Sequence, residues 1–499
     1  MKKFIQGSIF FLAASISEVA SASSGAYLAS RQAISDHNFV TASEFQTKSV
    51  SADPSNSKLL EGLMISFIAQ GSVDKAVSIA EVYRDNGNLS QISQMVQSAS
   101  LIKAGKTEAF LNFVKDASEI TPILKDLLSA WILMGLNDEV NANLIFDETA
   151  NVQGMGQFAN FHRAMSQLAA GKFDQAQKTF SRIHSDQGNP TRRSVIYHTK
   201  LLLSQSKFKE AQRLLEKWFG PTFDPEIEGL FVNATNEKVY PKTSFSETNI
   251  AVADVFHSIA NLISKEADPT FTLIYSRLAQ YLDFKHVDST LMTADLLVEL
   301  GQHNLAIKEH EKLSNSHPQF FASELGRAEA LRSSGKEMEA IEVLANLTVQ
   351  YPNAANGFSI LGNHYRRLEL YDRAEVAYGE AINLYKNKGE AGWFLYYVRG
   401  ITRERLDLWT LAEKDFRKAL SLNPTQPQVL NYLGYSLIEK NSNLDEALEM
   451  IERAVKESPD SGYIVDSLGW GYYKPVSYTH LRAHETRHDR VCRLLLEKK

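Results

Sequence analysis

The sequence predicts an all-α fold in which pairs of helices stack into an α-α superhelix. The first observation is a unit of about 34 residues that recurs from Val287 to Pro475. The second is that each unit places small residues where its two helices would cross and larger apolar residues between neighbouring pairs. The third is a proline that often follows the second helix, where it stops helical growth. A solenoid of helix–turn–helix units combines these three features.

The clearest unit runs from Trp393 to Gln426. Gly400 stands where the first helix would approach the second, and Pro424 follows the second helix. Three residues have the i, i+4, i+7 spacing of one helical face, namely Ala412, Phe416 and Ala419. This unit therefore predicts two helices around a short turn, with a shared buried face.

Neighbouring units repeat the same residue types in register. The corresponding residues, in chain order, are Ala294, Ala306, Leu313 and Pro318; Ala328, Ala340, Leu344 and Pro352; Leu361, Gly362, Ala374, Tyr378 and Ala381; and Leu433, Gly434, Ala447, Ile451, Ala454 and Pro459. A last unit begins at Gly462 and breaks off after its first helix. We therefore expect the solenoid to end in a truncated repeat.

These recurring residues resemble tetratricopeptide repeats, and the resemblance implies a right-handed solenoid. The whole chain also resembles exported repeat proteins of unassigned role from alphaproteobacteria. The motifs that carry this second resemblance are Tyr432–Tyr435 and Gly462–Trp470.

The N-terminal half carries the pattern more loosely. Residues 23–219 predict degenerate helical repeats of the same kind. Residues 220–249 hold several prolines and glycines without a helical period, which predicts an irregular connection. Residues 250–475 then return to helix. We therefore expect two solenoid segments joined at 220–249, which together could form one continuous superhelix.

The first 22 residues have the composition of a leader. Lys2 and Lys3 precede an apolar run from Phe4 to Ile16, and Ala20–Ala22 has the small-x-small pattern of a cleavage site. The apolar run is shorter than the ~20 residues that a bilayer span needs. These features predict a signal peptide cleaved after Ala22, export to the periplasm, and no stable membrane insertion of the mature chain.

Residues 476–499 break the repeat pattern. Val476–Thr486 resembles one reading frame of a transposase-type sequencing adapter, and Asp489–Lys499 resembles the adjoining flow-cell primer, so we interpret this tail as non-native. Within it, His484–His488 fits the H-E-x-x-H zinc motif. No third ligand is evident and the flanking residues lack apolar packing, so we predict no metal site and no cofactor. The only cysteine, Cys492, falls in the same tail.

The charge argues against nucleic acid as a partner. The full chain carries a formal charge of −6; the tail holds six Lys and Arg against three Asp and Glu, and the leader two Lys against one Glu, which leaves residues 23–475 at −10. Nucleic-acid binding and anionic membrane surfaces both favour clustered Lys and Arg. We interpret the acidic balance as a contribution to solubility.

The resemblance to tetratricopeptide repeats also predicts where a partner would bind. In that family, repeat positions 2, 5, 9 and 12 of the first helix line a concave groove. The candidates that combine amide, charged and aromatic groups at these positions are Asn363, Arg366, Tyr397, Asn431, Tyr435 and Asp466. The tyrosines have an alternative, because aromatic residues also pack between repeats. Ser359 stands where a carboxylate clamp of tetratricopeptide cochaperones would have Lys, so we do not predict that specificity.

The function that follows is a non-enzymatic scaffold or adaptor that binds a protein or an extended peptide. Two alternatives remain open from the sequence. One is an assembly or export factor of the cell envelope, suggested by family resemblance alone. The other is an enzyme, either a zinc hydrolase through the tail motif or a repeat platform whose catalytic part lies beyond the break.

Overall fold

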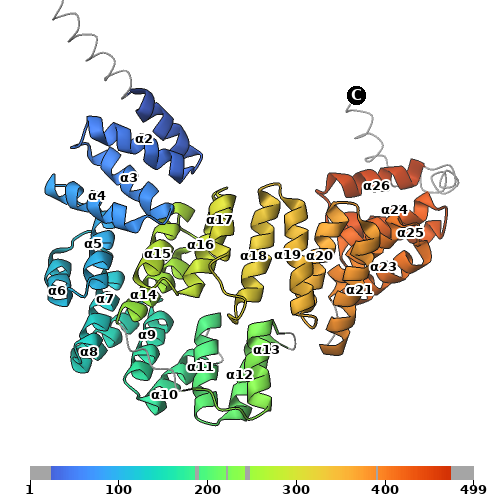
Figure 1. Ribbon diagram of the computed structural model, residues 1–499. Helices are drawn as coiled ribbons and strands as arrows, with labels where there is room; N and C mark the ends of the chain where they lie inside the picture. Colours follow the sequence, from blue (N-terminus) through green and yellow to red (C-terminus); the bar gives the residue numbers. More distant parts are fainter. Residues whose placement is uncertain (1–23, 186–189, 221–222, 242–247, 389–391, 474–499) are drawn as a thin grey trace, which may run out of the picture. The chain divides into compact units, whose positions relative to one another are not determined.

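The computed structural model describes residues 24–185, 190–220, 223–241, 248–388 and 392–473. Within these ranges every regular element is an α-helix and no strand occurs, which confirms the predicted all-α class (Figure 1). The predicted leader and tail, including the zinc motif and Cys492, lie outside the described residues. The chain divides into two compact units, and the division in the sequence falls between Val343 and Leu344.

Unit 1 comprises the helices up to Val343. After a helical stretch at 24–35, they are α2 (Phe39–Ala52), α3 (Ser57–Ala69), α4 (Val73–Asp85), α5 (Gln91–Lys103), α6 (Thr107–Asp116), α7 (Pro122–Gly135), α8 (Glu139–Asn151), α9 (Gly156–Ala169), α10 (Phe173–Ile183), α11 (Arg192–Ser204), α12 (Phe208–Phe219), α13 (Pro225–Thr235), α14 (Thr248–Ile263), α15 (Pro269–Leu282), α16 (Val287–Glu299), α17 (His303–His310) and α18 (Phe320–Ser333).

Unit 2 begins within α19 (Glu337–Gln350), where the division falls. Its other helices are α20 (Ala355–Arg367), α21 (Tyr371–Lys388), α22 (Trp393–Arg405), α23 (Trp409–Leu422), α24 (Pro427–Glu439), α25 (Leu444–Glu457) and α26 (Gly462–Tyr473). α20 packs on α21, α22 on α23 and α24 on α25, and each pair packs on the first helix of the next. This is the predicted helix–turn–helix stack, and its core is one continuous cluster from Ala374 to Leu468.

The turn inside a helix pair often needs a residue with left-handed backbone. Gly301 between α16 and α17 has φ 72°, and Asp407 between α22 and α23 has φ 59°. Glycine adopts this conformation without steric cost, and Asp tolerates it better than most residues. The short turn brings the second helix back along the first, so that their apolar faces meet.

Unit 1 departs from the expected simple stack. Helices α2 to α13 form an arc, and α14 to α17 lie on the inner side of that arc (Figure 1). α14 packs on α7, and α15 packs on α3 and α5. One apolar cluster runs from Met64 to Leu282, so helices before and after residues 220–249 share a core. The helices that follow residues 220–249 therefore fold back onto those that precede them.

The segment 220–249, for which the sequence predicts an irregular connection, contains α13. Asp224 caps this helix by accepting hydrogen bonds from the N–H groups of Glu226 and Ile227, at 3.0 and 3.1 Å. Pro225, which the sequence suggested as a helix breaker, occupies the first turn, where its fixed φ favours a helix start. α13 packs on α12 and α11 and so continues the arc.

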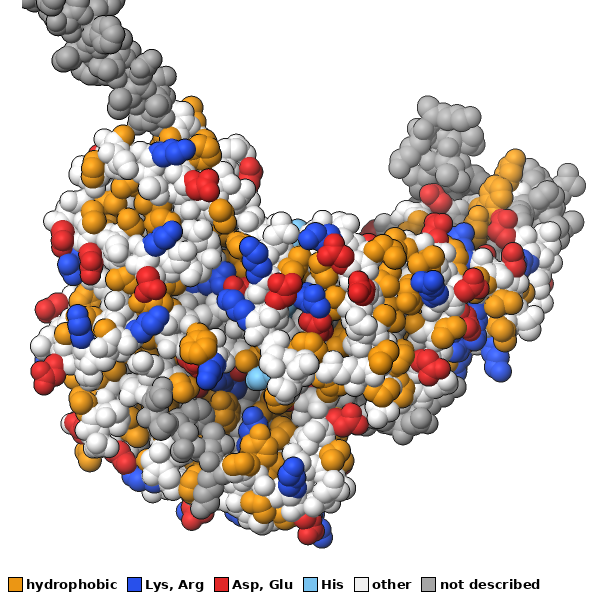
Figure 2. All heavy atoms as spheres, in the orientation of Figure 1, with side chains coloured by type: hydrophobic (Ala, Val, Ile, Leu, Met, Phe, Trp, Pro, Cys, Tyr) orange, Lys and Arg blue, Asp and Glu red, His pale blue; other side chains and the backbone are white. Residues whose placement is uncertain are grey.

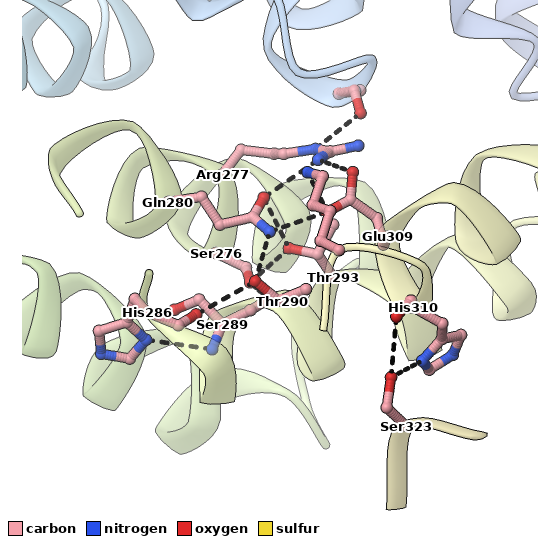
Figure 3. Close-up of polar contacts among 12 residues, drawn as sticks. Ser276, Arg277, Gln280, His286, Ser289, Thr290, Thr293, Glu309, His310 and Ser323 are labelled. Carbon is pink, nitrogen blue, oxygen red and sulfur yellow. Dashed lines mark hydrogen bonds and ion pairs between the residues drawn. The ribbon is translucent and has the colours of Figure 1, made fainter. Parts of the chain in front are cut away.

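A buried polar cluster joins the inner helices to the arc. Arg277 on α15 donates from Nε to the carbonyl of Ala69 on α3 at 3.0 Å, and from Nη1 to Oε1 of Glu309 on α17 at 2.6 Å. Gln280 and Lys312 donate to the other carboxylate oxygen of Glu309, at 2.9 and 2.6 Å. Figure 3 shows how the side chains of Arg277, Gln280 and Glu309 converge. This cluster fixes α15 and α17 to the C-terminal end of α3.

Candidate peptide-binding groove

The first helices of unit 2 lie close to their partners because small residues occupy the crossings. A Cβ added at Gly400 would lie 2.6 Å from Cε1 of Phe416, one at Gly362 would lie 2.7 Å from Cε1 of Tyr378, and one at Gly434 would lie 2.7 Å from Cγ1 of Ile451. Real Cβ atoms essentially never approach so closely, so each crossing requires glycine unless its neighbour moves. The small and large residues that the sequence placed at the same repeat positions are thus the ones that lie together at each helix crossing.

Side-chain contacts connect the first helices of successive pairs. The hydroxyl of Tyr432 on α24 donates to Glu404 on α22 at 3.2 Å. Trp470 on α26 donates from Nε1 to Oε1 of Glu439 on α24 at 2.6 Å. α22, α24 and α26 therefore form one side of the unit, and they carry most of the predicted groove positions.

The predicted pair Asn363 and Arg366 is held by a single tyrosine. The hydroxyl of Tyr378 on α21 donates to Oδ1 of Asn363 at 2.8 Å and accepts a hydrogen bond from Nε of Arg366 at 3.3 Å. Burial raises the pKa of Tyr378, so its hydroxyl stays protonated at neutral pH. Asn363 and Arg366 are half-buried. Tyr378 on α21, the second helix of the same pair, therefore fixes the positions of these two side chains.

Tyr397 and Asn431 lie deeper than the other candidates. Tyr397 is half-buried, with its ring 6.2 Å from that of Phe416 and 6.0 Å from that of Tyr432, centroid to centroid. Burial raises the pKa of Tyr397 to about 12. This environment matches the packing alternative that the sequence left open for the tyrosines. Asn431 is 7% exposed, and its Oδ1 has no hydrogen-bond partner within the described part of the chain.

Tyr435 and Asp466 face solvent, together with other aromatic residues at groove positions. Tyr435 is 39% exposed, and Asp466 is exposed as well. We call the exposed aromatic side chains on α22, α24 and α26 the aromatic strip: Phe394, Tyr435, Tyr463, Trp470 and Tyr473, which are 47%, 39%, 56%, 40% and 68% exposed. Each stands at repeat position 2, 9 or 12, as the groove prediction requires.

Sequence reasoning missed a buried ionic network behind these helices. Arg399 donates to both carboxylate oxygens of Asp415 at 2.8 Å, and Arg403 donates to Asp415 at 2.8 Å and to Glu375 at 2.6 Å. The side chain of Asp415 is only 4% exposed. A carboxylate beside Phe416 in an otherwise apolar helix face was the available sequence signal, because a buried charge needs a partner. The network ties α22 to α21 and α23.

The face drawn in Figure 2 shows no concentration of positive charge among the described residues. Figure 2 shows Lys and Arg interspersed with Asp and Glu over the visible face. Within the described residues, no group of three or more His, Cys, Asp or Glu is placed to hold a metal ion. Among the same residues, no helix has the length and apolar character to cross a membrane. The groove positions therefore offer aromatic contact area and a few hydrogen-bonding groups.

Comparison with known proteins agrees with this architecture. The tetratricopeptide repeat family matches residues 397–462 and, through a second model of the same repeat, residues 158–187. These two stretches therefore carry tetratricopeptide repeats, which supports a helical repeat scaffold.

One curated protein and two solved structures illustrate what the chain is similar to. A TPR repeat-containing protein of Pseudomonas aeruginosa is 28% identical over 155 residues, which cover 31% of this chain and 26% of that protein. The chain thus matches about a quarter of the length of this curated relative. Among solved structures, the APC/C hetero-tetramer Cut9-Hcn1 aligns at a TM-score of 0.38 and 13% identity, over 91% of this chain and 98% of the matched chain. Yeast Tom70 aligns at a TM-score of 0.38 and 15% identity, over 96% and 92% respectively.

Proposed function

We propose that the chain is a non-enzymatic scaffold or adaptor that binds a protein or an extended peptide along the first helices of unit 2. The observation that carries this proposal is the aromatic strip. Tyr and Trp provide large contact areas with few rotatable bonds, and they are enriched among residues that dominate binding energy. Exposed aromatic side chains on the first helices of three successive repeats, α22, α24 and α26, suit a ligand that runs across those helices.

Polar groups beside the strip support recognition of a peptide backbone. The Tyr378 hydroxyl holds Asn363 and Arg366 in place before any ligand arrives. Such preorganisation reduces the entropy lost on binding. An amide and a guanidinium at these positions would donate hydrogen bonds to carbonyl or carboxylate oxygens, and Asp466 would accept bonds from N–H groups. The aromatic strip would then provide most of the contact area with the peptide, and these polar groups would orient its backbone.

We place this activity in the periplasm. The predicted leader supports export, and residues 23–475 contain no cysteine, which is compatible with an oxidising compartment. A fusion of residues 1–40 to a reporter that folds only after export would show activity if the leader works. An inactive fusion with normal expression would contradict the assignment.

Site-specific photocrosslinking tests the groove directly. A photoreactive phenylalanine analogue would replace Tyr435 or Tyr463 in the full chain, with Val140 on α8, which is 74% exposed, as the matched surface control. We expect discrete crosslinked protein bands at positions 435 and 463 and none at 140. Adding Arg366→Glu should weaken those bands. Equal crosslinking at all three positions, or none at the two groove positions, would contradict a binding groove on these helices.

A further inference from the structure

The groove of unit 2 lacks positive charge along α24 and α26. Neither helix contains a Lys or an Arg, and their only charged side chains are Glu439 and Asp466. Lys440, which follows α24, is directed elsewhere, since its ammonium lies 5.0 Å from the centroid of the Trp409 ring on α23. This end of the groove therefore presents aromatic rings and hydrogen-bond acceptors.

The three arginines of α22 all have acidic partners. Arg399 and Arg403 both bind Asp415 on α23, each at 2.8 Å. Arg405 lies beside Glu404, with 3.7 Å between Nε and Oε2. The positive charge of α22 is thus compensated within this helix and its own pair, and it does not extend to α24 or α26.

Asp466 on α26 is an acid at a groove position that has no partner. Its side chain is exposed, and among the described residues no hydrogen bond or ion pair involves its carboxylate. Trp470 on the same helix donates to Glu439 on α24. The two helices run in the same direction, because each is the first of its pair, so one turn earlier on each helix Asp466 and Tyr435 occupy neighbouring positions. An exposed aromatic ring therefore accompanies this carboxylate.

Asn431 on α24 adds a buried acceptor without a donor. It is 7% exposed, and its Oδ1 has no hydrogen-bond partner in the described part of the chain. Burial raises the pKa of Tyr397 on α22 to about 12, and Tyr463 on α26 adds to that shift, so these two tyrosines lie close to each other across α24. An unsatisfied buried acceptor is costly, so this part of the groove favours a ligand that brings hydrogen-bond donors.

We propose that the partner of this groove presents an arginine side chain, whose guanidinium pairs with Asp466 and stacks on the ring of Tyr435. This inference rests on the proposed function, since it names the chemical class of peptide that the groove binds. A guanidinium is planar, carries five N–H donors and stacks on aromatic faces, so it suits a carboxylate beside exposed rings. A further donor of the same peptide would satisfy Oδ1 of Asn431.

Other ligand charges fit this end of the groove less well. A carboxylate would meet Asp466 and Glu404, and α24 and α26 have no cation to offset the repulsion. Arg366, which accepts no charge from α24 or α26, belongs to α20 at the opposite end of the row of first helices, where the Tyr378 hydroxyl holds it. An ammonium is compact and strongly hydrated, and it cannot stack as a plane, so lysine should bind more weakly than arginine.

Fluorescence anisotropy with defined peptide pools tests this proposal on the full chain. The probes are labelled nonapeptides with Arg, Lys, citrulline or Glu at the centre, and with Ala, Leu, Pro or Ser at every other position. Citrulline keeps the shape of arginine but carries no charge. We expect the Arg pool to bind about tenfold more tightly than the citrulline pool, more tightly than the Lys pool, and most tightly relative to the Glu pool. Equal affinity of the Arg and citrulline pools, or of the Arg and Lys pools, would overturn the proposal.

Two matched variants assign the preference to its carboxylate. Asp466→Asn should reduce the tenfold preference for Arg over citrulline to about one, while the citrulline pool keeps its affinity. Asp372→Asn makes the same change at an exposed position on α21, a second helix, and should leave the preference intact. A full preference for Arg in Asp466→Asn would overturn the assignment.

Asn431→Leu tests the buried acceptor with a readout that a structural role would move. It removes the unpartnered oxygen at similar volume, so we expect weaker binding of all four pools and no fall in the midpoint of urea unfolding. Asn363→Leu is the contrast, because it removes the acceptor of the Tyr378 hydroxyl and should lower the midpoint. A lower midpoint with unchanged binding in Asn431→Leu would show that Asn431 is structural and overturn its role in the site.

The outcomes separate this inference from the proposed function. Equal binding of all four pools, with crosslinking retained at positions 435 and 463, would leave the groove in place and overturn its selection of arginine. Absence of binding by every pool would overturn this inference as well. Absence of crosslinking at positions 435 and 463 would contradict the groove itself.

Discussion

Arg277 on α15 donates to Glu309 on α17 at 2.6 Å, and both side chains are almost fully buried, at 3% and 7% exposure. The same guanidinium also donates to the carbonyl of Ala69 on α3. Ala69 lies 208 residues before Arg277 in sequence. One buried cation therefore joins an early helix of the arc to two helices on its inner side.

Removing this cation should destabilise unit 1 strongly. Arg277→Met leaves the Glu309 carboxylate buried without its main partner, so we expect the free energy of unfolding to fall by about 3–5 kcal/mol. Adding Glu309→Leu should recover much of that loss, because the uncompensated charge is then gone. Urea unfolding followed by circular dichroism measures the change. The exposed pair Arg332–Glu329 is the control, and Arg332→Met should cost about 1 kcal/mol or less. A similar loss in the free energy of unfolding for Arg277→Met and Arg332→Met would contradict this role of Arg277.

Two glycines of unit 2 should respond to alanine in opposite directions. At Gly400 the added methyl group meets the Phe416 ring, so Gly400→Ala should destabilise by about 1–3 kcal/mol. At Gly379 on α21 the nearest atom is Nη1 of Arg399 at 3.9 Å, so Gly379→Ala should stabilise by about 1 kcal/mol through helix propensity. Chemical denaturation of both variants provides the comparison. If Gly400→Ala stabilised the protein instead, the crossing of α22 and α23 would have enough space for the added methyl group.

The repeat register could be predicted because it depends on local spacing. Gly400 and Phe416 are 16 residues apart, and each unit repeats the same small and large residues at the same offsets. Buried contacts between α22 and α23 follow from those offsets alone.

The fold-back of unit 1 could not be predicted because its contacts are remote in sequence. Arg193 pairs with Asp254 and Asp288, which lie 61 and 95 residues further along the chain. Helical periodicity reports which face of α11 is apolar, but it does not report which distant helix covers that face. Pro225 indicated an irregular connection for a related reason. A proline in the first turn of a helix and one that ends a helix look alike unless the Asp224 cap is recognised.

The candidate groove residues also show which features of the site the sequence could predict and which it could not. Repeat position predicted that Tyr435 and Asp466 would face outward, and both are exposed. It did not distinguish them from Asn431, which the neighbouring helices bury to 7% exposure. Nor did it identify Tyr378 as the residue that holds Asn363 and Arg366, because that contact depends on side-chain reach across a helix pair.

Tyr378→Phe tests whether Asn363 and Arg366 contribute to binding or only to the structure of α20 and α21. The variant removes a hydroxyl that bonds Asn363 and Arg366 and leaves the ring in place, so stability should fall by about 1 kcal/mol. Crosslinking from position 435 should also weaken, because the two polar side chains lose their orientation. Tyr385→Phe on the same helix is the control and should change stability by less than about 0.5 kcal/mol. Normal crosslinking in Tyr378→Phe would assign Asn363 and Arg366 a purely structural role.

Unit 1 should lose stability when the pH falls below neutral. Burial lowers the pKa of five histidines to about 4 or 3, namely His162, His184, His198, His257 and His310. These side chains stay neutral in the folded chain while the unfolded chain protonates near pH 6.5, so unfolding takes up protons between about pH 6.5 and 4. Each histidine should therefore cost up to about 1.4 kcal/mol per pH unit in that window.

Asp126 and Asp295 act in the opposite direction, because burial raises the pKa of both, and Asp295 provides an internal control. Burial raises the pKa of Asp295 to about 6, so its ionised form is disfavoured in the folded chain. Acidification from about pH 6 to 4 relieves that penalty and offsets roughly one histidine. Urea unfolding at pH 7.5, 6.5, 5.5 and 4.5 should show the net loss. His162→Gln should make the loss shallower by one histidine, and Asp295→Asn should make it steeper. A free energy of unfolding that stays constant from pH 7.5 to 4.5 would contradict neutral buried histidines, since five histidines outnumber the two acids, Asp126 and Asp295, whose pKa values burial raises.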